Sequence, residues 1–390
     1  MTTVQRFKAA SGYVVAHGFS QLLLWSAFYY LLPALSSRIA AQTLWPVLHI
    51  STTYTLAFLV WAASAPLVGW LIDKGFGARV MRTGSILGAA LLVALSQTSD
   101  PWMFSVVVIG LGACMAATLY DPCFALVMRQ LGGEGASAVA TVTLIAGFAT
   151  LLTFPLVFAL SLTMGWQHIV LVFAGLAAVG AAIIPAQREA SPASSTRHSK
   201  MPLERGPALI AVAFGIVMMG HAILLFLLPV VLSRTQSNTN AGMLALAILG
   251  PAQIAGRLAW KAFGSVTSQQ NFVLILFACF CVPAPLLLVF GTTHWALYAA
   301  LIIQGACYGV HTILRPGLAQ LYLRRIHLGQ GLGTIAMVGV LLMAIGPAIG
   351  GFVWTYAGMS GLMWTILSLN VIAFVLGIFL RGTTTKGSDT

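Results

Sequence analysis

Charge is what this sequence has least of. Of its 390 residues, only 7% are charged and 59% are hydrophobic, and the mean hydropathy is +0.96. A soluble domain usually carries about 25% charged residues. The composition therefore excludes a soluble enzyme and is typical of a protein that lies within a lipid bilayer.

The sequence also lacks the alternation of apolar and polar residues that is typical of membrane β-strands. Its apolar residues form stretches of roughly 20, the length that a helix needs to cross about 30 Å of hydrocarbon. A helix satisfies its own backbone hydrogen bonds in lipid, so we predict an all-α membrane protein. The twelve predicted spans are 11–35, 49–72, 80–98, 102–128, 136–163, 167–187, 207–232, 240–263, 271–291, 294–319, 331–356 and 359–381.

No nucleotide-binding loop, metal-ligand cluster or catalytic triad is found, which argues against a primary pump or an enzyme and predicts no metal and no cofactor. The five cysteines lie inside apolar stretches, where Cys is usually a small hydrophobic residue, so they predict no disulfide framework. They are Cys114, Cys123, Cys279, Cys281 and Cys307. The first apolar stretch is long and contains polar residues, which favours a retained span over a cleaved signal peptide.

The net charge of +12 is spread over separate loops, which excludes a nucleic-acid partner. If both termini are cytoplasmic, 16 of the 19 Lys and Arg residues fall on the cytoplasmic side. Only Arg38 and Arg234 then lie outside, and Arg315 lies within a span. By the positive-inside rule we expect a multi-pass protein of the cell inner (plasma) membrane in this orientation.

The two halves of the chain are related in sequence. Residues 65–77 and 252–264 are identical at six of thirteen positions, and Asp121-Pro122 recurs as Arg315-Pro316. The stretch between the halves is rich in Ser, Pro and Ala, as flexible linkers are. We therefore predict an N-terminal six-helix bundle at 1–187, a cytoplasmic linker at 188–206 and a C-terminal six-helix bundle at 207–390, related by pseudo-symmetry.

One short motif indicates a family. Gly69-x-Leu71-x-Asp73-Lys74, followed by Gly77-x-Arg79, resembles the loop between helices two and three of the major facilitator superfamily. The resemblance covers the twelve spans and the central linker as well, and it implies a transporter fold in which this loop latches the two halves together. The implied latch residues are Gly69, Asp73, Lys74 and Arg79, with Gly256 and Lys261 in the second half. The alternative is an ordinary positively charged inside loop.

Polar residues inside the spans are few, and an ionisable group at mid-bilayer costs roughly 2.5 to 3.5 kcal/mol. Asp121 is the only acid within a predicted span, and Arg315 is its basic counterpart. Helical spacing places Gln304, Tyr308, His311 and Arg315 on one face of the tenth span, and Cys114, Thr118 and Asp121 on one face of the fourth. By the resemblance, spans one, four, seven and ten line a central cavity, which adds His17, Gln21 and His221 to the predicted substrate and proton site. The alternative is that these residues hydrogen-bond helices to one another.

We expect Asp121 and Arg315 to pair in one state and to separate in another. Arg315 could then exchange Asp121 for a substrate carboxylate or phosphate, or Asp121 could take up a proton that His311 relays. The sequence therefore predicts a secondary active transporter of a small organic solute, with a proton-coupled organic anion favoured. The alternative is efflux of drug-like amphiphiles, or of trivalent metalloids through Cys114 and Cys307. The expected partners are the small-molecule substrate, protons and the bilayer, and we expect a monomer.

Overall fold

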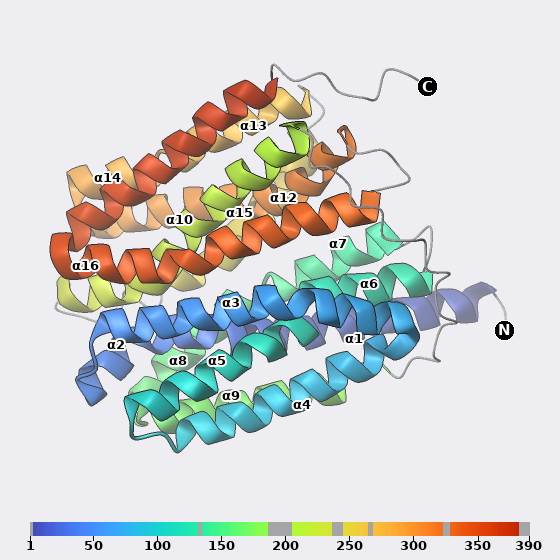
Figure 1. The fold of residues 1–390 in the computed structure, drawn as a ribbon, viewed down its shortest axis with the longest axis horizontal. Coiled ribbons are helices and arrows are strands. Elements are labelled where there is room, and N and C mark those ends of the chain that lie inside the picture. The colour runs from blue at the N-terminus through green and yellow to red at the C-terminus, as the bar shows by residue number, and fades with distance from the viewer. Residues whose placement is uncertain are drawn as a thin grey trace. The chain divides into compact units, whose positions relative to one another are not determined.

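The computed structural model describes residues 3–131, 135–185, 205–235, 245–263, 268–322 and 328–381. Within these ranges the chain is a series of long helices joined by short turns (Figure 1). The first half contains α1 Thr3–Leu24, the π-helix η1 Trp25–Tyr30, α2 Leu31–Thr43, α3 Val47–Leu71, the π-helix η2 Ile72–Phe76, α4 Gly77–Ser96, α5 Pro101–Thr118, α6 Tyr120–Leu131, α7 Gly135–Ala146, α8 Ala149–Ser161 and α9 Trp166–Ala182. The second half contains α10 Arg205–Thr235, α12 Leu249–Phe263, α13 Gln269–Phe280, α14 Pro283–Phe290, α15 His294–Gln320 and α16 Leu328–Arg381.

The helices confirm the predicted membrane architecture. Nine helical stretches of the described residues are long and apolar enough to cross a bilayer, and α9 is a shorter apolar helix. The 54-residue α16 contains two of the predicted spans, because Gly358 turns the chain with a left-handed φ of 59°. With α9, α12 and this division of α16, the described helices account for all twelve predicted spans.

Four of the described spans are interrupted along their length. One is the fifth, where α7 ends at Ala146 and α8 begins at Ala149. The first changes from α to π geometry over the six residues of η1, and π segments are frequent at functional sites. The fourth is broken at Leu119, whose φ of −76° and ψ of −157° separate α5 from α6. The ninth is broken before Pro283, where α13 has ended and α14 begins. These breaks expose backbone groups that side chains of other helices can bind.

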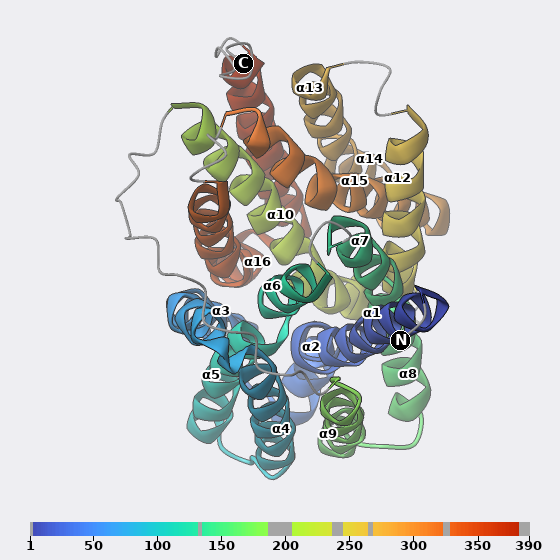
Figure 2. The same cartoon turned by 90° about the vertical axis from the view of Figure 1, so that its right-hand side faces the viewer.

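Contacts divide the chain into two compact units (Figures 1 and 2). Unit 1 contains Met1–Trp45 and Leu56–Thr196, and unit 2 contains Pro46–Thr55 and Arg197–Thr390. The first residues of α3 therefore pack with the second half of the sequence. The predicted linker at 188–206 lies outside the described residues except for its last two positions, so its boundaries stay a prediction.

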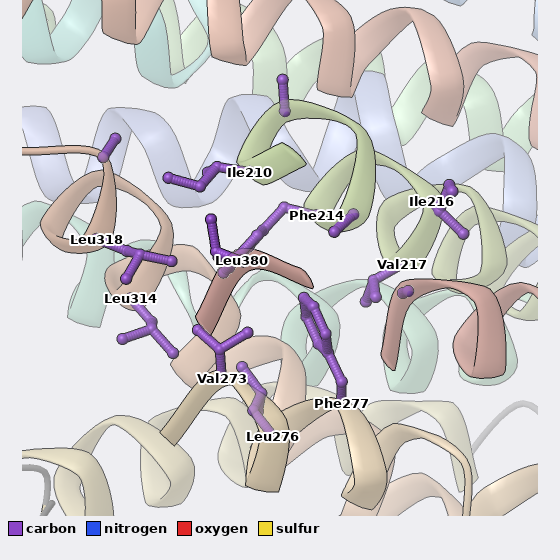
Figure 3. Packing of buried hydrophobic residues seen from close by; sticks show 14 of the residues in the cluster. Ile210, Phe214, Ile216, Val217, Val273, Leu276, Phe277, Leu314, Leu318 and Leu380 are labelled. Carbon is purple, nitrogen blue, oxygen red and sulfur yellow. The ribbon is translucent and has the colours of Figure 1, made fainter. Parts of the chain in front are cut away.

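A cluster of buried apolar side chains fills the interior of unit 2 (Figure 3). Phe214 of α10, Phe277 of α13 and Leu314 of α15 meet there, each no more than 1% exposed. The cluster holds α10, α13, α15 and α16 together, so α15 presents one face to this apolar core. The polar residues of α15 are positioned by this packing.

Close approaches of helix backbones occur in both units. A Cβ atom on Gly112 of α5 would lie 2.0 Å from the carbonyl oxygen of Ala57 in α3, and one on Gly309 of α15 would lie 2.1 Å from the carbonyl oxygen of Gln253 in α12. A Cβ on Gly305 would lie 2.8 Å from that of Ala252, also between α15 and α12. Small residues allow membrane helices to pack backbone against backbone. The second and fourth spans, and the eighth and tenth, thus make equivalent contacts.

Candidate functional site

The structure brings together three of the four residues of the predicted stripe on α15. The ring of Tyr308 stacks on His221 of α10 at a centroid distance of 3.7 Å and an interplanar angle of 12°. The ring of His311 is almost parallel to Tyr308, at 5.4 Å and 6°. Gln304 Nε2 donates to His221 Nδ1 over 3.4 Å. The helical spacing of the sequence thus produces one cluster, which we call the ring stack: His221, Gln304, Tyr308 and His311.

Two acceptor atoms of the ring stack have no hydrogen-bond partner among the described residues. His311 Nε2 donates to the carbonyl oxygen of Phe214 over 3.0 Å, which leaves Nδ1 as the acceptor nitrogen of a neutral imidazole. Gln304 Oε1 is the second such atom. Both residues are almost fully buried, and a buried acceptor without a donor costs about 1–3 kcal/mol. Such atoms fit a site where a proton or the donor group of a ligand binds.

Two arginines act on the ring stack. Arg315, one turn beyond His311 on α15, directs Nη1 to the sulfur atom of Met218 at 3.5 Å and interacts electrostatically with His311 and Tyr308. Arg257 of α12 also interacts with Tyr308, is only 6% exposed, and lies with Nη2 3.5 Å from the hydroxyl of Thr312. The described residues of unit 2 include no Asp or Glu. The site contains two guanidinium groups, from α12 and α15.

The sequence does not predict a site role for Arg257. The positive-inside rule counts it among the bases of the cytoplasmic side, and the structure buries it within α12 and against α15. Its position inside a predicted apolar span was the available signal. A buried guanidinium is a stronger indication of a binding site than one in a loop.

In unit 1, the predicted site residue Gln21 makes two hydrogen bonds through its side chain. Its Nε2 donates to the carbonyl oxygen of Thr118 over 2.7 Å, and its Oε1 accepts from Trp25 Nε1 over 3.2 Å. The hydroxyl of Thr118 donates to the carbonyl of Cys114, and the side chain is fully buried. Gln21 thus links the first span to the break in the fourth.

The break itself has a physical cause. Pro122 has no N–H, so the carbonyl of Thr118, four residues earlier, loses its helical donor. Gln21 supplies that donor, and Leu119 adopts an extended conformation between α5 and α6. Asp121 is exposed and lies in the first turn of α6. The N-terminal end of a helix favours a negatively charged side chain. Asp121 and Arg315 belong to different units, so their pairing stays a prediction.

His17 lies one turn before Gln21 and is 1% exposed. Its Nδ1 lies 3.6 Å from the sulfur atom of Cys123, and its ring meets Tyr13 edge to face at 4.6 Å. Its Nε2 has no hydrogen-bond partner among the described residues. His17 is therefore packed inside unit 1, and its role in proton or substrate binding stays a prediction.

Aromatic rings gather around η1. The indole of Trp25 lies 4.6 Å from the ring of Tyr120, 4.9 Å from that of Tyr29 and 6.2 Å from that of Trp61. Tyr29 stacks in turn on Phe58 at 5.6 Å and 10°. Trp25 remains partly exposed, so unit 1 offers an apolar, aromatic surface beside Gln21 and the break at Leu119.

The middle of the predicted latch motif forms the π-helix η2. Gly75 has a φ of 93°, a left-handed conformation that strongly favours glycine. Lys74 lies over the ring of Trp70 at 5.9 Å, and Arg79 over that of Phe76 at 5.8 Å. The side chain of Asp73 lies outside the described residues. The latch role of these residues stays a prediction.

Arg129, at the end of α6, was not predicted to take part in this loop. Its Nη1 donates to the carbonyl of Ile72 over 2.5 Å, so the fourth span holds the start of η2. No pattern in the sequence links these two positions.

Among the other predicted latch residues, a Cβ on Gly69 would meet no described atom within 4 Å.

The second copy of the motif is built differently. A Cβ on Gly256 would lie 2.1 Å from the carbonyl oxygen of Ala306, so this glycine allows α12 and α15 to touch. The side chain of Lys261 lies outside the described residues. Gly256 therefore has a packing role in unit 2, whatever part it plays in a latch.

A bundle of helices that are long and apolar enough to cross a membrane defines the class, a multi-pass membrane protein. The chain belongs to the major facilitator superfamily, whose family model matches residues 18–281. Among solved structures, it is similar to a variant of the nucleoside transporter NupG, with 15% identity, a TM-score of 0.77, and coverage of 95% of this chain and 98% of the other.

The chain is also similar to a bacterial homologue of the human lysosomal transporter Spinster in an inward-facing, occupied conformation. Identity is 9%, the TM-score is 0.72, and 98% of each chain is covered. No curated protein sequence matches the chain. At these identities, the likeness to solved structures shows the fold alone.

Proposed function

We propose that the chain is a secondary active transporter of a small organic anion, coupled to protons, in the cell inner membrane with both termini in the cytoplasm. The observation that carries the proposal is the charge of the site in unit 2. Arg257 and Arg315 both act on Tyr308, deep within the helices of that unit. A substrate carboxylate or phosphate would bring the negative charge that these two guanidinium groups favour.

A guanidinium is suited to this task, because its planar N–H groups bind both oxygens of a carboxylate or phosphate. Buried charge is costly in a membrane, and an anion beside these two groups would lower that cost. The bound anion is therefore stabilised by two charges that the fold has already placed. A substrate that binds one conformation of the protein more tightly than another shifts the equilibrium toward that conformation.

Proton coupling follows from the same cluster. His311 lies one turn before Arg315 on α15, so a substrate anion bound beside Arg315 would favour a proton on His311. Nδ1 of His311 has no hydrogen-bond partner among the described residues and could accept that proton. Anion and proton would then bind together, which is the behaviour of a symporter. Asp121 of unit 1 is the second candidate for the coupling group.

A second function is favoured by the aromatic surface around Trp25. Its rings suit the export of drug-like amphiphiles or the transport of an uncharged ring compound, such as the nucleosides that NupG is named for. Stacking of a ring on aromatic side chains does not need a charged partner. Transport of such a compound in preference to anions would favour this function.

The test is transport by the purified protein in proteoliposomes, with and without a pH gradient. The panel contains small carboxylates, phosphate esters, uridine as the uncharged ring compound, and a cationic amphiphile. We expect at least one anion to be transported and to be accelerated by a proton gradient. Transport of uridine or the cation alone would contradict the proposal. Thermal-shift screening of the same panel identifies the ligand first, because binding raises the unfolding midpoint.

Variants then assign the roles. Arg315→Lys keeps the charge but not the bidentate geometry, so we expect anion transport to fall about tenfold or more. Arg381→Lys, at the exposed end of α16, is the matched control and should transport normally. Normal transport by Arg315→Lys would contradict bidentate recognition. Unchanged proton dependence in Asp121→Asn would remove Asp121 from the coupling role and leave His311.

A further inference from the structure

The amide of Gln304 is buried in unit 2 and is oriented by one neighbour. Its side chain is 2% exposed, and Nε2 donates to His221 Nδ1 over 3.4 Å. His221 is held in turn by Tyr308, whose ring stacks on it at 3.7 Å. The nitrogen and the oxygen of an amide point in different directions, so Oε1 of Gln304 faces away from His221. This oxygen has no hydrogen-bond partner among the described residues.

The oxygen of Gln304 differs from the other acceptor of the ring stack. Nδ1 of His311 can be satisfied by a proton, because a neutral imidazole is a base. An amide does not titrate, so Oε1 of Gln304 is satisfied only by an N–H or O–H group that reaches it. A buried acceptor without a donor is unfavourable, and a bound molecule that supplies the donor removes that cost. A ligand of this site therefore gains affinity from a donor group.

The guanidinium of Arg315 lies near this amide, as its contacts with α10 show. Its Nη1 is 3.5 Å from the sulfur atom of Met218, and a Cβ on Gly339 of α16 would lie 3.3 Å from the same nitrogen. Met218 precedes His221 by three residues, so the two share one face of α10 with a rise of about 4.5 Å between them. Measured along α10, the guanidinium thus lies within about one turn of the residue that binds Gln304.

This short separation limits the ligand. An anionic group bound to Arg315 and a donor bound to Gln304 can belong to one molecule of a few carbon atoms. Tyr308 and Arg315 are each half-buried, so part of the site stays accessible. An ammonium group also donates, but it would place a second positive charge close to Arg315, which is unfavourable. A hydroxyl group donates without that penalty.

We propose that Gln304 is a specificity-determining residue, whose Oε1 accepts a hydrogen bond from a hydroxyl group of the substrate while Arg315 binds the anionic group. The substrate class is then a small hydroxylated carboxylate or phosphate ester. This inference rests on the proposed anion transport and adds a second recognition element to it. An anion without the hydroxyl leaves the buried oxygen unsatisfied, and a site built to bind a hydroxyl rejects such an analogue.

The first test compares substrates and needs no variant. Proton-driven uptake into proteoliposomes is measured for glycolate and acetate, lactate and propionate, malate and succinate, and glycerol 3-phosphate and propyl phosphate. The methyl ether of each hydroxy acid keeps the oxygen and lacks the O–H. We expect kcat/KM to be about 10- to 100-fold higher for the hydroxylated member of a transported pair than for its partner or its methyl ether.

The outcomes separate this proposal from the one on which it rests. Equal values within every transported pair would show that water satisfies Oε1 of Gln304, and would overturn the substrate class while anion transport stands. A methyl ether transported as well as its hydroxy acid would overturn the hydrogen bond from the hydroxyl. Absence of transport of every anion would overturn both proposals.

Variants supply the second test. Gln304→Met keeps the size and removes the acceptor, so we expect kcat/KM for the hydroxylated anion to fall to that of its partner, which changes little. Gln270→Met is the matched control and should keep the preference, because the Gln270 amide donates to the Tyr322 hydroxyl at the start of α13 over 2.6 Å. A preference that persists in Gln304→Met, or an equal loss for both members of a pair, would overturn the role of Gln304. If this variant does not fold, the comparison of substrates in the parent protein still decides the substrate class.

Discussion

The fourth and tenth spans carry an ionisable residue followed by proline at positions that the internal repeat matches, yet only the fourth is broken there. α5 ends at Thr118 and α6 begins at Tyr120, whereas α15 runs without interruption from His294 to Gln320. The two spans differ in the side chain that a neighbouring helix brings to the residue four positions before the proline. In unit 1 an amide from the first span covers the carbonyl that proline has freed, and in unit 2 Arg257 reaches the side of α15 at Thr312.

The same comparison holds for charge. Unit 1 carries an exposed acid, Asp121, at the start of a helix, and unit 2 carries buried or half-buried bases, Arg257 and Arg315, around stacked rings. A duplicated fold has thus kept its helix contacts while its two polar sites have diverged. The contacts are tested by stability, and the sites by ligand binding.

The largest effect on stability should come from the helix contacts that the two units share. Gly112→Ala would place a Cβ against the backbone of Ala57, and Gly309→Ala against that of Gln253, at 2.0 and 2.1 Å from carbonyl oxygens. Backbone cannot move aside as a side-chain tip can, so we expect each variant to lose about 1–3 kcal/mol or more. The measurement is the thermal unfolding midpoint in detergent.

The controls for these variants lie on the same helices. Gly110→Ala on α5 and Gly317→Ala on α15 would meet their nearest described atoms at 3.4 and 3.5 Å, which is ordinary van der Waals contact. Alanine also favours helix over glycine by about 1 kcal/mol, so these controls should be neutral or stabilised. A loss in only one of the two units would show that the shared contact is not equally important in both.

The next effect is confined to the broken span. Gln21→Leu removes the donor to the carbonyl of Thr118, and we expect a loss of about 1–3 kcal/mol for the unsatisfied buried group. Pro122→Ala restores an N–H four residues after Thr118 and should reduce the cost of Gln21→Leu. The double-mutant cycle in thermal unfolding measures this coupling directly.

The exposed Gln97→Leu, whose amide donates only to the adjacent Ser96 hydroxyl, serves as the control and should change stability little. If Gln21→Leu costs the same in the Pro122→Ala background as in the parent protein, proline is not the reason that Gln21 is needed. The comparison with the tenth span would then rest on Leu119 alone.

The sequence predicts the architecture better than it predicts these details. Hydropathy and the repeat are properties of single segments, so they indicate the spans and the matched halves, and helical spacing placed Gln304, Tyr308 and His311 on one face. Whether a helix breaks near a proline also depends on the side chains of the helices packed against it. α8 continues past Pro155 and α10 past Pro229, while α5 stops before Pro122. Only tertiary structure shows which proline meets a donor.

The site was predicted in part for the same reason. Spacing along α15 cannot show that His221 of α10 stacks on Tyr308, although both residues were predicted to belong to the site. Charge counting places Arg257 on the cytoplasmic side, but it does not show which of the bases on that side are buried. Gly256 was expected in a latch because of its motif, and its contact with Ala306 depends on the packing of two helices.

The smallest effect concerns a third proline. Next to Pro347 of α16, the N–H of Ala348 donates to the hydroxyl of Thr55 in α3 over 2.9 Å. Gln21 plays the converse part in unit 1, because its side chain donates to a backbone carbonyl near Pro122. Thr55→Val keeps the shape and removes the acceptor, and we expect a loss of about 0.5–1.5 kcal/mol in thermal unfolding. Thr52→Val is the matched control, because the Thr52 hydroxyl donates to Leu48 within its own helix over 2.8 Å. Equal losses in the two variants would show that the bond to Ala348 adds nothing to stability, and that a side chain of another helix stabilises the backbone near a proline in unit 1 alone.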